Sequence, residues 1–168
     1  MCLQLVKGKA RVKTAKEDII CWKVLNYYAS PNNDVYISPY QKIEYKIGER
    51  VVIDKPWDRM QFQSYCFGNS GDATYFYQIS HIINGGGVYT FKDKDEAMDF
   101  MKWMQEEHKE TVVAIKCIIP KGTKYYKGLF QVLGYKSEKP IESYASKELF
   151  VMDEVIWSQN NVQKGIEK

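Results

Sequence analysis

The sequence has few residues that bind metals or form disulfides. Its 168 residues include four cysteines, none in a C-x-x-C pair, and two histidines. A closed zinc site needs such ligands at recognisable spacings, so we expect no metal. Cys21 and Cys117 lie within apolar runs, and we expect them to be buried, reduced thiols with no disulfide.

Long apolar runs and a strong excess of one charge are also missing. No run approaches the ~18 apolar residues that a membrane helix needs, and residues 1–16 lack the apolar core of a secretory signal. We therefore expect a cytoplasmic protein with no membrane partner. The net charge of +3 comes from 24 basic and 21 acidic residues. This near balance argues against nucleic acid as the main partner.

What is present is the composition of a folded domain, with 45% hydrophobic and 27% charged residues. Runs of β-branched and aromatic residues between turn clusters predict many strands. We expect a single α+β domain over 18–157, preceded by a basic arm (1–17) and followed by a polar tail (158–168). The strand predictions cover 19–25, 35–37, 43–53, 62–67, 74–83, 88–91, 111–119, 124–135 and 149–157.

One segment predicts the main helix. Asp93 with Glu96 three positions later is a capping signature at a helix N-terminus. The residues that follow place one apolar face at intervals of three and four. We place this helix at about 94–109. The members of the apolar face are Ala97, Phe100, Met101, Met104 and His108.

The N-terminal arm is basic. Five cationic residues precede the first acidic residue, Glu17. Charge runs are commonly solvated, and a solvated leader is one interpretation. A clamp for phosphates or for an acidic surface is the other. The five are Lys7, Lys9, Arg11, Lys13 and Lys16.

Three segments carry a resemblance to a known family. They are 86–91 (GGVYTF) before the predicted helix, 112–122 (VVAIKCIIPKG), and 147–153 (KELFVMD). In order and spacing they resemble the ADP-ribosyltransferases, particularly the poly(ADP-ribose) polymerase-like branch. The resemblance covers about 75 residues of the C-terminal half. It implies a split, mostly antiparallel sheet and a cleft that binds NAD.

The resemblance also implies site residues. Glu148 matches the catalytic glutamate, whose carboxylate suits the positive charge that develops on the ribose as nicotinamide leaves. Tyr89 matches the residue that stacks on the nicotinamide ring. Where the family has an Arg or His on its first strand, this chain has Lys23, which lacks the hydrogen-bonding geometry of either. Hydroxyls near the donor would come from Ser38, Tyr40 or Thr90.

Structural roles without any part in binding or catalysis also stay open for individual residues. Glu148 fits a surface carboxylate, and Tyr89 fits a core aromatic. Cys2 fits either a strand residue or, after removal of Met1, an N-terminal nucleophile. His81 and His108 fit structural positions better than a catalytic triad.

Two main function hypotheses follow, and whether the protein is an enzyme stays open; nucleic-acid binding through residues 7–16 with tyrosine stacking ranks below both. The first is an ADP-ribosyltransferase-like domain that binds NAD or a related adenine nucleotide, with or without turnover. The alternative is a small non-enzymatic binding protein, of a kind that phages encode, that inhibits a host enzyme or sequesters a signalling nucleotide. The second would depend on exposed aromatic and cationic residues such as Trp57 and Arg59.

Overall fold

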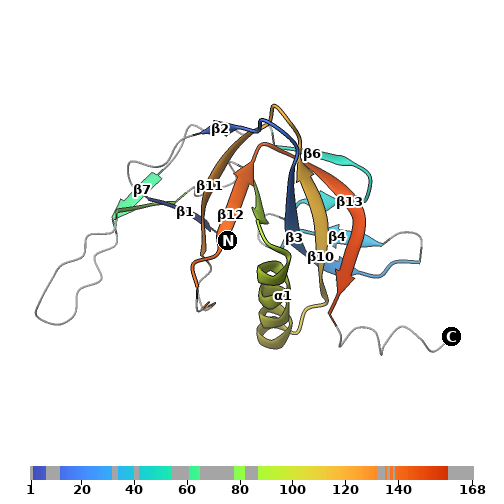
Figure 1. Cartoon of the computed structure of the whole chain (residues 1–168). Coiled ribbons are helices and arrows are strands. Elements are labelled where there is room, and N and C mark those ends of the chain that lie inside the picture. Colours follow the sequence, from blue (N-terminus) through green and yellow to red (C-terminus); the bar gives the residue numbers. More distant parts are fainter. Residues whose placement is uncertain are drawn as a thin grey trace, which may run out of the picture.

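The computed structural model describes residues 2–6, 12–31, 34–39, 42–53, 61–64, 78–81, 87–131, 135, 137 and 139–158. In these ranges it has thirteen strands and one helix, α1 (Lys94–His108) (Figure 1). The strands are β1 (Cys2–Val6), β2 (Lys13–Thr14), β3 (Ile19–Tyr28), β4 (Val35–Ile37), β5 (Glu44–Tyr45), β6 (Arg50–Val52), β7 (Gln61–Ser64), β8 (Gln78–His81), β9 (Val88–Phe91), β10 (Val112–Ile119), β11 (Lys124–Gln131), β12 (Glu142–Ser146) and β13 (Glu148–Trp157).

The strands form one sheet in the order β6-β13-β10-β3-β9-β12-β11-β1-β8-β7. Strand β2 pairs with β11, and β4 joins β3 to β5. Each pairing between described strands is antiparallel. The expected α+β class is therefore wrong: the domain is a mostly antiparallel β-sheet with one helix. The expected split sheet is also replaced by a continuous one, because the single pair Trp22↔Phe91 joins β3 to β9.

Side chains that alternate along β3 divide the sheet into two faces. Cys21 and Leu25 belong to a core on what we call the inner face, which β4 and β5 help to cover through Tyr36 and Tyr45. Trp22 and Val24 belong to a second core on the opposite face, which we call the helix face because α1 packs there. The residues of both cores are hydrophobic, and their burial is the main stabilising contribution.

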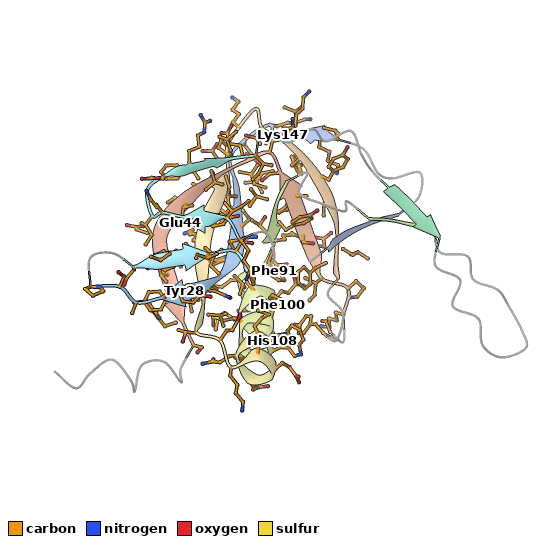
Figure 2. All side chains as sticks on the ribbon, turned by 180° about the vertical axis from the view of Figure 1, so that it is seen from behind. Tyr28, Glu44, Phe91, Phe100, His108 and Lys147 are labelled. Carbon is orange, nitrogen blue, oxygen red and sulfur yellow. The ribbon has the colours of Figure 1, made fainter. Side chains whose placement is uncertain are left out.

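Helix α1 lies close to its predicted position and buries the predicted stripe, apart from the exposed His108. Phe100 is fully buried and its ring lies 4.8 Å from that of Phe130 and 5.4 Å from that of Phe91, measured between centroids. Figure 2 shows Phe91 and Phe100 one above the other where the helix meets the sheet. The helix ends at Lys109, whose left-handed backbone donates to the Gln105 carbonyl, an αL cap.

The expected N-terminal arm contributes two strands to this sheet, since β1 pairs with β11 and β8 and β2 pairs with β11. Of the expected polar tail only Ser158 is described, and it is buried. Across the described ranges, no helix has both the length and the apolar character needed to cross a membrane.

Candidate functional site

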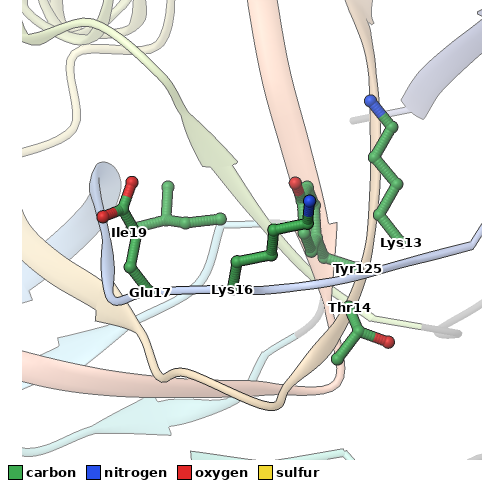
Figure 3. Close-up of a pocket in the computed structure, with 6 residues that line it drawn as sticks. All are labelled: Lys13, Thr14, Lys16, Glu17, Ile19 and Tyr125. Atoms are coloured by element: carbon green, nitrogen blue, oxygen red, sulfur yellow. The ribbon is translucent and has the colours of Figure 1, made fainter.

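A pocket of about 410 Å³ lies between the segment from β2 to the start of β3 and the adjacent strand β11. Figure 3 shows its six lining side chains, with Tyr125 reaching in from β11. Volumes of this size suit small organic ligands. The lining residues are Lys13, Thr14, Lys16, Glu17, Ile19 and Tyr125.

Main-chain hydrogen bonds fix the shape of this pocket. Lys13 lies directly opposite Tyr125 in the β2–β11 pairing, so the two side chains emerge on the same face. Ala15 then donates to the Thr123 carbonyl and accepts from the amide of Gly122, over 3.0 and 2.8 Å. Gly122 has φ +87°, a backbone conformation that glycine adopts without strain. The pocket wall is therefore tied to the β10–β11 turn at Ala15.

The cations of the pocket are free to bind an anion. Lys13 and Lys16 are exposed and form no ion pair with any described residue. Glu17 is the one carboxylate among the lining side chains. The half-buried ring of Tyr125 packs edge-on against Tyr144, with centroids 5.7 Å apart. Two free ammonium groups beside a held aromatic ring make an arrangement suited to a phosphate joined to a planar ring.

The sequence predicted only part of this pocket. Lys13 and Lys16 are the last two members of the basic arm, for which a phosphate clamp was one interpretation. Thr14 and Tyr125 were not predicted, because the β2–β11 pairing that joins them spans more than 100 residues. The high proportion of aromatic residues in 124–135 was the only signal for Tyr125.

Lys23, predicted to bind nucleotide, lies in the core. Its side chain is on the inner face, 1% exposed, and its Nζ donates to the Tyr89 carbonyl at 2.8 Å. The ammonium also lies 5.7 Å from the centroid of the Tyr45 ring. Burial lowers the pKa of Lys23 to about 8, because the charged form loses its hydration. At this position Lys23 supports the sheet.

Thr90 and two thiols share the inner face with Lys23. Burial raises the pKa of Cys21 to about 12, against smaller opposing effects of the Thr90 hydroxyl and the Lys23 charge. Burial likewise raises the pKa of Cys117 well above its usual range. Both cysteines are free and fully buried, which confirms their predicted burial. Thiols held neutral in this way are poor nucleophiles.

Glu148 lies on the opposite face of the sheet from Lys23. It precedes Leu149, which is fully buried on the inner face, so alternation turns Glu148 to the helix face. There it forms an ion pair with Arg50 of the edge strand β6. The structure therefore brings the Lys23 ammonium to the main chain of Tyr89 and places Thr90 on the same face as Lys23, whereas Glu148 pairs with Arg50.

Of the remaining predicted site residues, two are buried and three lie outside the described part of the chain. Tyr89 is buried, with its side chain on the helix face like that of Phe91. Ser38 is buried at the end of β4. Tyr40, Trp57 and Arg59 lie outside the described residues.

The residues considered as a nucleophile or as triad members lie in strands and at the end of the helix. Cys2 lies in strand β1 and His81 in β8. His108, at the end of α1, has its ring 5.3 Å from that of Trp103, edge to face. In the part of the chain that the structure describes, no three His, Cys, Asp or Glu side chains are grouped to hold a metal ion.

Comparison with known proteins finds no matching family model, no similar curated protein and no similar solved structure.

Proposed function

We propose that this protein binds an adenine nucleotide, such as NAD or ADP-ribose, in the pocket between β2 and β11. The ammonium groups of Lys13 and Lys16 bind the phosphates, and the Tyr125 ring packs against a base or ribose. The observation that carries the proposal is the joining of two unpaired lysines and a held aromatic ring in one pocket. Charge-assisted hydrogen bonds to phosphate are stronger than neutral ones.

In this proposal the nucleotide is held without turnover. A transferase of the resembled type needs its glutamate beside the nicotinamide ribose, and Glu148 instead pairs with Arg50. Its partner in the resemblance, Lys23, is 1% exposed on the other face. The protein would thus sequester a nucleotide rather than consume it, and it would do so in the cytoplasm.

Calorimetric titration with ADP-ribose and with NAD tests the proposal. The double variant Lys13→Ala/Lys16→Ala should lose binding at least tenfold, because both phosphate contacts are removed. Tyr125→Leu should weaken binding while keeping the pocket charge. Lys102→Ala removes an exposed lysine that pairs with Asp99 on α1, and as a control it should bind like the unmodified protein.

Two results would count against the proposal. If the double variant binds as tightly as the control, the pocket is not the site. If nicotinamide is released from NAD over hours by the purified protein, the chain is an enzyme and the absence of turnover is wrong.

A further inference from the structure

Beyond the pocket, a second group of unpaired lysines lies on the segments that form its wall. Lys121 is in the β10–β11 turn, Lys124 opens β11, and Lys147 joins β12 to β13. Strand pairing sets Lys124 opposite Thr14 of the pocket, and the amide of Lys147 donates to the Lys124 carbonyl at 3.2 Å. We call Lys121, Lys124 and Lys147 the lysine ridge.

The three ridge lysines form no ion pair with any described residue. The six ion pairs between described residues use Arg50, Lys92, Lys94, Lys102, Lys116 and Lys127. None of them uses a ridge lysine or a pocket lysine. Asp18 is nearby, and its carboxylate accepts from the main-chain amide of Lys121 at 2.8 Å. Nine solvent-accessible lysines among the described residues form no ion pair, and five of them lie on the pocket and ridge segments; the other four are Lys42, Lys46, Lys109 and Lys139.

The position of the ridge can be followed in the views of the whole chain. Lys147 lies at the end of the sheet opposite His108 and the last turn of α1 (Figure 2). Strand β2 is at that same end in Figure 1. The segments that carry the pocket and the ridge therefore meet at one end of the domain and contribute to the surface there.

We infer that this surface binds single-stranded nucleic acid, with a terminal nucleotide in the pocket and the following phosphates along the lysine ridge. The inference rests on the proposed function, which supplies the site for the first nucleotide. A strand is favoured over a lone nucleotide because three further cations continue from the pocket wall. An aromatic ring beside a cationic track is the usual arrangement for such strands, since every base can stack on it.

The small net charge does not oppose this inference. Five lysines and Arg50 elsewhere in the described chain are paired with carboxylates, and a strand experiences the local field of the surface it touches rather than the net charge. Each phosphate bound by lysine releases counterions, so affinity should fall steeply with added salt.

The test compares ADP-ribose with a 5′-phosphorylated oligoadenylate of about six nucleotides, a length within the range that such sites cover. The triple variant Lys121→Ala/Lys124→Ala/Lys147→Ala should bind the oligonucleotide at least tenfold more weakly and bind ADP-ribose unchanged. Its salt slope should be smaller by about 2, from three lost phosphate contacts. Lys92→Ala/Lys102→Ala/Lys116→Ala removes the same charge from paired lysines and should leave both affinities within about twofold.

The possible failures are distinguishable. If ADP-ribose binds but the oligonucleotide binds no better, or the triple variant binds it normally, the ridge inference is wrong and the proposed function stands. If ADP-ribose does not bind, the proposed function fails. Binding to phosphatidylserine vesicles that depends on the ridge, without oligonucleotide binding, would overturn the inference in favour of a membrane surface.

Discussion

The ammonium group of Lys23 hydrogen bonds to the main-chain carbonyl of Tyr89 at 2.8 Å, beside the single residue pair that joins β3 to β9. A β-sheet normally satisfies such a carbonyl through its ladder. Here the Tyr89 carbonyl accepts instead from a buried side chain, at the place where only one residue pair joins β3 to β9. Lys23 therefore helps to hold the two halves of the sheet together, which is a structural role for a residue predicted to bind nucleotide.

This role predicts a particular dependence of stability on pH. Burial lowers the pKa of Lys23 from 10.5 to about 8. Between these values the unfolded chain binds more protons than the folded one, so the contribution of Lys23 to stability rises with pH. Relative to Lys23→Met, the unmodified protein should gain about 3 kcal/mol from pH 8 to 10.5. Urea unfolding across this range measures the gain.

The difference between the two proteins matters because other groups titrate in the same range. Lys102→Met removes an exposed lysine and retains Lys23, so it should show the same gain relative to Lys23→Met as the unmodified protein does. A constant difference in the free energy of unfolding between the unmodified protein and Lys23→Met from pH 8 to 10.5 would contradict the lowered pKa of Lys23.

Phe100 should be a main determinant of stability. It is fully buried and its ring packs against four aromatic rings, those of Phe91, Trp103, Phe130 and Tyr135. Phe100→Ala should lower the free energy of unfolding by about 3–5 kcal/mol, through lost burial and the cavity left behind. Lys102→Ala on the same helix should change it by less than about 0.5 kcal/mol. Equal effects in urea unfolding would contradict the packing described for α1.

Glu148 should be dispensable for nucleotide binding. Its ion pair with Arg50 is partly solvated, since the arginine side chain is 60% exposed. Glu148→Gln should therefore cost less than about 1 kcal/mol of stability and leave the affinity for ADP-ribose unchanged. Calorimetry and urea unfolding check both. A large loss of affinity would show that Glu148 contacts the nucleotide, as the resemblance to the ADP-ribosyltransferases implies.

The two core thiols should be chemically silent in the folded protein. Cys21 and Cys117 are fully buried with raised pKa values. Iodoacetamide at pH 8 should leave both unmodified in the native state and alkylate both in urea, as read by peptide mapping. Rapid native alkylation of either one would mean that the inner face opens to solvent.

Local signals in the sequence located most of the elements. The helix followed from the capping signature at Asp93 and the spacing of its apolar residues, and it begins at Lys94 as expected. Strand β3 followed from its run of β-branched and aromatic residues, although it extends to Tyr28. These patterns act over a few residues, which is why a sequence displays them directly.

Local patterns did not show which face of the sheet each side chain takes or which strands pair with one another. Glu148 and Lys23 each lie next to core residues, and a shift of one residue decides the face that each side chain takes. The pairing of β1 and β2 with β11, more than 100 residues away in sequence, was likewise outside the reach of local patterns. The same long-range pairing builds the pocket.

The location of the nucleotide is the central claim, and photoaffinity labelling tests it most directly. An azido-adenine nucleotide bound to the protein and irradiated should label peptides that contain Tyr125 or residues 13–19, and unlabelled ADP-ribose should compete. Label on the peptides of Tyr89 or Glu148, with residues 13–19 and Tyr125 unlabelled, would contradict the account and place the nucleotide where the resemblance to the transferases puts it.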